Sequence, residues 1–292
     1  MLILHDGNPL THIDRPWVNH ALIAAMIGVF LLQLADAVPW QTFAFFPAQL
    51  WNLWPSPGPL NGALGLLTHQ FLHGDILHIL ANLVTLRVFG DNIEDALGHV
   101  RYALFFLGSG AIAAVTQGVL GDPYVPLIGA SGAIAAVMAG YLLLHPRARI
   151  LVLAFNIAPI LAPASLVVGF GIFVNIAMAY DVTLLTGGPP DPRDLVIAWW
   201  AHIGGFACGL AFVPLLKARG VPLFQPAPTT QGAGMRWLGR LIPSLSWPGD
   251  RPFAEDTTAA VAAAINPART KLLVFIKAAL YILLIFVLMR YL

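Results

Sequence analysis

Residues 129–144 read GASGAIAAVMAGYLLL, an apolar run without a charged side chain. As a straight helix rising about 1.5 Å per residue, this run would cover about 24 Å, less than the hydrocarbon thickness of a bilayer, about 30 Å. A helix too short to cross must begin below the surface, at the floor of a cavity lined by protein. Ser131 stands at that beginning, between Gly129 and Gly132. The stretch therefore predicts a recessed membrane helix with a hydroxyl group in its first turn.

The composition of the whole chain places this run in a membrane protein. Of 292 residues, 58% are hydrophobic and 10% are charged, whereas about a quarter of the residues of soluble chains are charged. The mean hydropathy is +0.78. These values exclude secreted and disordered classes, and a net charge of +1 gives no field that would recruit nucleic acid. The single cysteine, Cys208, excludes an intrachain disulfide and a multi-cysteine metal site.

Further apolar runs lie before and after residues 129–144 in the sequence. Together they predict an all-α polytopic membrane protein. The segment Val38–Leu67 between the first two runs, rich in Pro and Trp, is interpreted as an interfacial connection, and Ile150–Pro163 as an interfacial or re-entrant segment. The organisation is a cytoplasmic segment at 1–17, a six-helix core at 18–216, a cytoplasmic linker at 217–270 and a seventh helix at 271–292. The predicted core spans are Val18–Ala37, Ile76–Phe89, Val100–Leu120, Gly129–Leu144, Ala164–Tyr180 and Leu195–Leu216.

The basic residues give the orientation of these spans. With the N-terminus inside, twelve Lys and Arg residues, Arg87 among them, flank the inner ends, and only Arg193 and Arg290 flank the outer ends. This bias satisfies the positive-inside rule and predicts a cytoplasmic N-terminus. A short N-terminus without an Arg-rich transit segment favours a bacterial inner membrane. The linker holds a basic amphipathic stretch near Arg236 that is expected to lie on the membrane surface.

Two polar side chains are predicted to meet near the outer face. Ser131 begins its span, and His202 stands seven residues after Leu195, about 10 Å down a helix. A serine hydroxyl becomes a useful nucleophile only with a base within hydrogen-bond reach, and a neutral histidine is the usual base. Small residues at four-residue spacing allow the two helices to approach closely, and they are Gly132, Ala136 and Gly140 on one helix and Ala201, Gly205 and Gly209 on the other. Generic packing is the competing interpretation, but the shared depth and flanking glycines favour a catalytic pair.

His78 and Asn82 are four residues apart, so both project from one face of the second span. An imidazole and an amide in this arrangement can donate hydrogen bonds to the oxygen of a tetrahedral intermediate. The same pair can equally tie the second span to a neighbouring helix. The residues by themselves favour neither interpretation.

Four motifs, in this order along the chain, resemble the rhomboid family of intramembrane serine proteases. The resemblance extends from about His69 to Leu216, so it covers the predicted six-helix core. The motifs are His78-Ile-Leu-Ala-Asn82, Gly90-Asp-Asn-Ile-Glu94-Asp-Ala-Leu-Gly98, Gly129-Ala-Ser131-Gly132 and Ala201-His202-Ile-Gly-Gly205. The seventh predicted helix is similar to the six-plus-one arrangement of this family.

The resemblance implies specific roles for these residues. Ser131 would be the nucleophile and His202 the general base and acid, without an aspartate. His78, Asn82 and the Ser131 backbone N–H would form the oxyanion hole. Glu94 would be a structural group that bonds backbone at the inner side, and the glycines of the motifs would likewise be structural, namely Gly90, Gly98, Gly129, Gly132 and Gly205. No cofactor or metal is implied, and the partners would be transmembrane protein substrates within the lipid bilayer.

Two positions depart from the family pattern. A Trp-Arg pair often precedes the second span, where this chain has Leu64-Gly65, and an aromatic residue often stacks on the histidine from four residues after the serine, where this chain has Ala135. Neither departure removes a reacting atom. The sequence therefore predicts a protease that cleaves a peptide bond of membrane proteins near the outer face. The alternative is a non-catalytic rhomboid-like binder or chaperone, and a transporter is disfavoured because no internal repeat is found.

Overall fold

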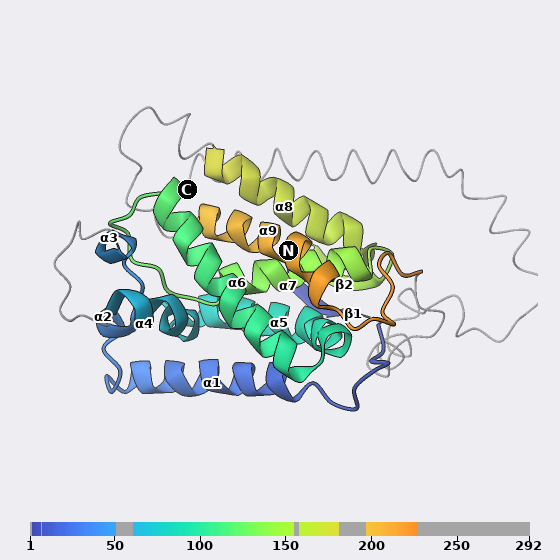
Figure 1. Ribbon diagram of the computed structural model, residues 1–292, viewed down its shortest axis with the longest axis horizontal. Coiled ribbons are helices and arrows are strands. Elements are labelled where there is room, and N and C mark those ends of the chain that lie inside the picture. The colour runs from blue at the N-terminus through green and yellow to red at the C-terminus, as the bar shows by residue number, and fades with distance from the viewer. Residues whose placement is uncertain (1, 7, 51–60, 155–157, 181–196, 227–292) are drawn as a thin grey trace, which may run out of the picture. The chain divides into compact units, whose positions relative to one another are not determined.

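The computed structural model describes residues 2–6, 8–50, 61–154, 158–180 and 197–226. Within these residues, six helices of at least 14 residues form a bundle, accompanied by short helices and a small sheet (Figure 1). The predicted seventh helix at 271–292, most of the predicted linker and the basic stretch near Arg236 lie outside the described residues.

The six bundle helices overlap the six predicted core spans. Four of them, α1, α5, α6 and α9, are long and apolar enough to cross a membrane, while α7 and α8 are shorter apolar helices. The prediction of a polytopic helical membrane fold is confirmed. The bundle consists of α1 (Trp17–Leu34), α5 (Ile76–Leu97), α6 (His99–Leu120), α7 (Ser131–Leu144), α8 (Ala164–Tyr180) and α9 (Trp199–Leu216).

Helix α7 lies at the centre of the bundle. It contacts α5, α6, α8 and α9, and every residue from Gly132 to Val137 is buried. A helix that is apolar all round belongs inside a protein or a membrane, and the short side chains of its Gly and Ala residues allow four neighbours to surround it. The part of α7 that directly follows Ser131 is therefore held in place by its neighbours.

Helix α5 is longer than predicted, because the start of α1 and the chain before it provide hydrogen bonds to the polar second half of α5. The span was expected to end at Phe89, but the helix continues to Leu97. The buried Glu94 carboxylate accepts hydrogen bonds from the backbone N–H groups of Val18 (2.9 Å) and Asn19 (2.7 Å) at the start of α1, and it also pairs with His99. Asp95 likewise accepts bonds from the backbone at residues 11–13.

The greater length of α5 also means that one basic residue lies further from the end of the helix than predicted. Arg87 was expected to flank the inner end of its span, but it lies within α5. Its guanidinium is 3.3 Å from the carboxylate of Asp91, one turn further along the helix. A partner on the same helix face explains how the helix accommodates this charge.

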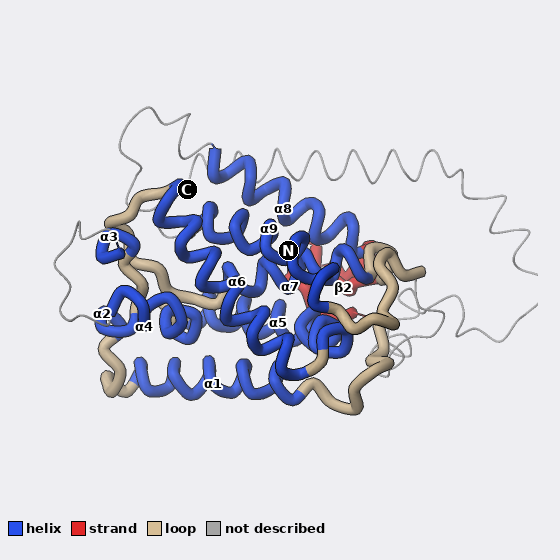
Figure 2. The backbone as a smooth tube through the Cα atoms, viewed as in Figure 1, coloured by secondary structure: helices blue, strands red, loops and turns tan. Residues whose placement is uncertain are grey.

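The segment predicted as interfacial or re-entrant forms a β-hairpin. Strands β2 (Arg149–Ala154) and β3 (Ala158–Pro163) pair antiparallel, and β1 (Leu2–Asp6) adds to the other edge of β2. Figure 2 shows this sheet in red at the end of the bundle away from α2 and α3. Ile150, Leu151 and Val152 are all fully buried, and Ile150 and Val152 belong to the main apolar core, so the hairpin is held by packing on β2. Burial also raises the pKa of the Asp6 carboxyl in β1 well above its usual range.

The predicted connection Val38–Leu67 contains three short helices, α2 (Trp40–Phe43), α3 (Pro47–Leu50) and α4 (Asn61–Thr68), and a 3-10 turn follows at His69–Phe71. Despite the missing Trp-Arg pair, this region is anchored. Gly65 lies so close to Ala44 that an added Cβ would be 2.8 Å from the Ala44 carbonyl oxygen. The Thr68 hydroxyl donates to the carbonyl of Phe43 at 2.7 Å.

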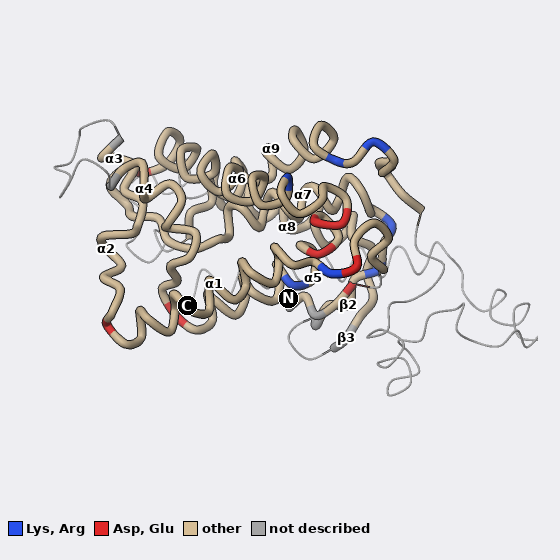
Figure 3. Tube along the Cα trace, turned by 60° about the horizontal axis from the view of Figure 1, so that its bottom comes forward, with Lys and Arg blue, Asp and Glu red and all other residues tan. Residues whose placement is uncertain are grey.

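Basic side chains are distributed unevenly along the bundle. Figure 3 shows no Lys or Arg around α2, α3 and α4, whereas blue positions occur toward the end that carries β2 and β3. Lys217 and Arg219 follow the end of α9, and Arg147 and Arg149 follow the end of α7. Among the described residues, Lys and Arg are thus absent where α7 and α9 begin and frequent where they end.

The predicted small-residue faces of α7 and α9 do meet. A Cβ added at Gly205 would overlap the carbonyl oxygen of Gly132, and one added at Gly209 would overlap the carbonyl oxygen of Ala136. The backbones of the two helices are therefore in direct contact at two successive turns. This is the close approach that small residues permit between membrane helices.

We expect Gly209→Ala to destabilise the protein by about 1–3 kcal/mol, because its methyl group would be forced against backbone that cannot move aside. Gly169→Ala on α8 is the matched control, since an added Cβ there has no atom within 4 Å. That variant should change stability by less than about 1 kcal/mol. Loss of helicity during titration of the detergent-solubilised protein with dodecyl sulfate measures both. Equal stability of the two variants would contradict the close approach.

Candidate active site

Ser131 is the first residue of α7, and the backbone before it has an unusual conformation. Gly129 has φ +107°, a value that glycine adopts far more readily than other residues. Its N–H donates to the carbonyl of His69 at 2.8 Å. The residue at the helix N-cap, Ala130, provides no side-chain cap, so the N–H groups of the first turn are available to another acceptor.

His202 lies in the first turn of α9, and this corrects the predicted depth. The span was expected to start at Leu195, but Ile197 and Ala198 are not helical and α9 begins at Trp199. A hydrogen bond from the Ala201 N–H to the Gln117 side-chain oxygen at 3.1 Å fixes this start against α6. Both predicted reacting groups therefore stand in the first turns of their helices.

The structure brings these two side chains together. His202 Nε2 lies 2.7 Å from Ser131 Oγ, and both residues are half-buried. The other ring nitrogen, Nδ1, lies 2.6 Å from Oδ1 of Asn175 on α8. Among the described residues, the aromatic ring in contact with His202 is that of Trp199, edge-on with centroids 6.1 Å apart. A hydroxyl, an imidazole and an amide thus form one hydrogen-bonded row across three helices.

His78 and Asn82 lie on the other side of the Ser131 backbone. A Cβ added at Gly129 would be 2.7 Å from His78 Nε2 and 3.7 Å from Asn82 Nδ2. Asn82 is buried, and its Nδ2 has no hydrogen-bond partner among the described residues. A buried donor without a partner is costly unless a ligand satisfies it. This placement, next to the first turn of α7, favours the oxyanion interpretation over a link to a neighbouring helix.

Sequence reasoning assigned no role to three residues that shape the site. His69 Nδ1 bonds the Gly65 carbonyl at 2.8 Å while its own carbonyl accepts from Gly129. Burial lowers the pKa of His69 to about 4, so its ring is neutral at physiological pH. Gln117 and Asn175 are the other two. Each is an isolated amide in an apolar helix, which is the signal that could have identified them.

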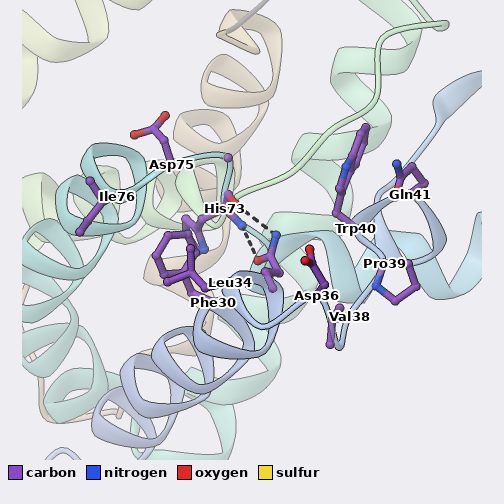
Figure 4. Close-up of a pocket in the computed structure, with 12 residues that line it drawn as sticks. Phe30, Leu34, Asp36, Val38, Pro39, Trp40, Gln41, His73, Asp75 and Ile76 are labelled. Atoms are coloured by element: carbon purple, nitrogen blue, oxygen red, sulfur yellow. Dashed lines mark hydrogen bonds between the residues drawn. The ribbon is translucent and has the colours of Figure 1, made fainter.

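A cavity of about 560 Å³ lies beside the site, between the end of α1, α2 and the start of α5. Figure 4 shows Trp40, Asp36 and Asp75 around it, and its dashed lines mark the two hydrogen bonds that join the Gln33 side chain to the backbone of His73. The His73 ring meets His78 edge-to-face with centroids 5.1 Å apart. Burial lowers the pKa of His73 to about 4, so a neutral histidine separates this cavity from His78.

The remaining motif residues lie at the other end of α5, away from Ser131. Gly90 lies so close to Tyr102 that an added Cβ would be 2.6 Å from its hydroxyl oxygen, and Gly98 has φ +80° where α5 turns into α6. The Glu94 carboxylate bonds the first turn of α1, as described above. The described residues contain no group of three His, Cys, Asp or Glu side chains that could hold a metal ion.

The fold and the site together define a class. The chain is an integral, multi-pass helical membrane protein with a serine and a histidine in hydrogen-bond contact at the ends of two closely packed helices. The Rhomboid domain family model matches residues 60–219. This chain belongs to the rhomboid family.

Relatives from bacteria, plants and animals agree with this assignment. Rhomboid protease GlpG of Klebsiella pneumoniae is 27% identical over 221 residues, which cover 74% of this chain and 66% of the relative. RHOMBOID-like protein 12, mitochondrial, of Arabidopsis thaliana is 35% identical over 172 residues, 53% of this chain and 47% of the relative. Human presenilin-associated rhomboid-like protein, mitochondrial, is 26% identical over 224 residues, which cover 71% of this chain and 52% of the relative. The chain thus matches between about half and two thirds of the length of these relatives.

We expect Gly129→Ala to lower the thermal unfolding midpoint in detergent, because the methyl group would require a strained φ and would press on the His78 ring. Such backbone strain costs about 1–3 kcal/mol. Gly108→Ala in α6 is the control, since an added Cβ there has no atom within 4 Å. An unchanged midpoint for Gly129→Ala would show that the loop before α7 adapts freely and does not fix the position of Ser131.

Proposed function

We propose that this chain is an intramembrane serine endopeptidase that hydrolyses a peptide bond in or near the transmembrane segments of membrane proteins. The observation that carries the proposal is the 2.7 Å hydrogen bond between Ser131 Oγ and His202 Nε2. Membership of the rhomboid family supports it. The catalytic core is residues 18–216, and 1–17, 217–270 and 271–292 are the cytoplasmic segment, the linker and the seventh helix.

Acylation begins with proton transfer along that hydrogen bond. As Ser131 Oγ attacks the carbonyl carbon of the substrate, its proton passes to His202 Nε2. The tetrahedral intermediate then collapses, the carbon–nitrogen bond breaks, and His202 gives the proton to the leaving amine. The products of this half-reaction are a free amine and an ester on Ser131. No metal or cofactor is required by this sequence of steps.

Stabilisation of the negative oxygen comes from groups that already surround the start of α7. The Ser131 backbone N–H belongs to a first turn without a side-chain cap. Asn82 supplies an Nδ2–H donor without a partner among the described residues, and the His78 ring lies beside Gly129. Fixed donors of this kind stabilise the transition state because they need no reorientation when charge develops.

Deacylation requires water at a place that lipid would exclude. Both helices that carry the dyad begin at this end of the bundle, and the backbone before them has polar groups that hydrocarbon cannot satisfy. We place an aqueous opening here, on the outer face. The oxygen of a water molecule attacks the ester carbon while His202 takes a proton from that water. His202 then gives this proton to Ser131 Oγ as the acid product leaves.

Charge distribution supports the orientation within this proposal. Arg147 and Arg149 after α7 and Lys217 and Arg219 after α9 stand at the ends opposite the dyad. The positive-inside rule then puts the N-terminus in the cytoplasm and the dyad toward the outer face. The localisation that fits is a bacterial inner membrane. Transmembrane protein substrates would reach the site from the lipid bilayer.

Labelling of the purified full-length chain with a fluorophosphonate tests the dyad. We expect a covalent adduct at Ser131 that both Ser131→Ala and His202→Ala abolish, together with cleavage of a model single-pass substrate. The control is Ser109→Ala, because the Ser109 hydroxyl is buried elsewhere without a partner in the described residues. Retained cleavage in Ser131→Ala would refute the mechanism. A folded wild-type chain that binds the model substrate without adduct or cleavage would support the non-catalytic rhomboid-like binder instead.

Asn82→Ala should reduce the cleavage rate by about 100 to 1,000 fold, the usual effect of removing one oxyanion donor. Thr85→Ala is the matched control one turn further along α5, because the Thr85 hydroxyl donates only to its own helix, at Ala81 (2.8 Å). That variant should cleave at the wild-type rate. Equal rates for the two variants would return Asn82 to a packing role.

A further inference from the structure

Asn175 is the one described side chain besides Ser131 that hydrogen-bonds the His202 ring. It lies within α8, whose sequence from Leu166 to Tyr180 is otherwise dominated by apolar residues. A polar amide inside a membrane helix is costly, so it is expected to have a partner and a function. The rhomboid motifs found in the sequence include no residue of α8.

The hydrogen bonds of Asn175 fix the direction of its amide. Its Nδ2 lies 2.8 Å from the carbonyl oxygen of Gly171, one turn earlier in α8. A carbonyl oxygen can only accept, so the group facing it must be the NH₂. The amide oxygen therefore faces His202. The reversed amide would place two acceptors against each other at Gly171, and this excludes it.

The direction of the amide determines which nitrogen of His202 carries the proton. Because Asn175 Oδ1 can only accept, Nδ1 of His202 must donate, and in a neutral ring Nε2 then has a free lone pair. That lone pair points at Ser131 Oγ, 2.7 Å away. The row Gly171, Asn175, His202, Ser131 is consistent at every link, with each donor facing an acceptor.

We infer that Asn175 is a positioning residue that holds His202 in the tautomer able to accept the Ser131 proton. The inference rests on the function proposed above and completes a Ser-His-Asn row where the sequence predicted an unassisted dyad. A neutral amide cannot take the proton of Nδ1, so it orients the ring and stabilises the imidazolium only as a hydrogen-bond acceptor. In other hydrolases the third group of such a row has this role.

The surroundings of His202 explain why an amide is needed here. Position 135, four residues after Ser131, is a buried alanine and provides no ring to stack on the imidazole. Trp199 contacts the His202 ring only edge-on, with centroids 6.1 Å apart, which leaves the tautomer free. The Ser131 hydroxyl can donate or accept, so among the described residues the bond to Asn175 is the contact that fixes which ring nitrogen carries the proton. The hydrogen bond therefore replaces stacking as the means of orientation.

The test uses the full chain in detergent with Asn175→Leu, which removes the acceptor, and Asn175→Asp, which retains it. Asn175→Ala provides the same loss should the leucine variant fail to fold. The control is Ile176→Leu, an exposed neighbour on α8. The first readout is the ¹⁵N spectrum of histidine-labelled protein, with His202→Gln to assign the His202 signals. The second is the rate of fluorophosphonate inactivation, separated into its maximal rate and its half-saturating concentration.

We expect wild type, Asn175→Asp and Ile176→Leu to show His202 with a protonated Nδ1 and an unprotonated Nε2. Asn175→Leu or Asn175→Ala should lose this signature, and the maximal inactivation rate should fall at least about tenfold, short of the about 10⁴-fold lost when a catalytic histidine is held in the wrong tautomer. The half-saturating concentration should stay constant, because Asn175 contacts the base and not the reagent.

An unchanged His202 tautomer and an unchanged rate in the folded leucine or alanine variant would overturn the inference and leave the proposed protease intact. Failure of the Asp variant to retain the tautomer would also overturn it, because an acceptor at the same position would then be insufficient. Absence of labelling in wild type would instead refute the proposed function. The tautomer signature would still decide the role of Asn175 in that case.

Discussion

The contact between the backbones of α7 and α9 is the constraint on which the site depends. Gly205 and Gly209 lie against the carbonyl oxygens of Gly132 and Ala136, so no side chain separates the helices over two turns. A hydrogen bond of 2.7 Å between side chains as short as serine and histidine is possible only when their helices approach this closely. The hydrogen bond of the dyad therefore depends on the packing of small residues between α7 and α9. A methyl group added in this interface would disturb both the packing and the distance between Ser131 and His202.

A second constraint is that the dyad stands at helix starts. A first turn leaves N–H groups without partners inside the helix, and a membrane protein must satisfy them or give them water. At α9, Gln117 provides an acceptor for the Ala201 N–H. At α7, Ala130 provides none, and Asn82 and His78 add further donors nearby. The uncapped first turn of α7 and the Asn82 Nδ2–H, which has no partner among the described residues, make this start suitable for a developing negative charge.

The sequence predicted those parts of the structure that follow from periodic apolar runs and from small residues. It located the six bundle helices, the faces of Gly132 and Gly205, and the meeting of Ser131 with His202. It failed where distant segments satisfy polar groups. The extension of α5 depends on Glu94 bonding residues 76 and 75 positions earlier, and β1 pairs with a strand about 150 residues away. No local pattern contains such partners.

The start of α9 shows why a correct pairing followed from an incorrect depth. The expected helix began at Leu195, which placed His202 about 10 Å from the start of the helix. The observed α9 begins at Trp199, so His202 lies close to its N-terminal end. The pairing holds because it depends on the register between α7 and α9, which the glycines at four-residue spacing set, and not on the distance of either residue from a helix start. Asn175 had no such register to reveal it, because α8 approaches His202 through one amide and not through a repeated face. A single polar residue in an apolar helix therefore carries information that periodicity cannot supply. For Asn175, the direction of its hydrogen bonds determines which ring nitrogen of His202 carries the proton.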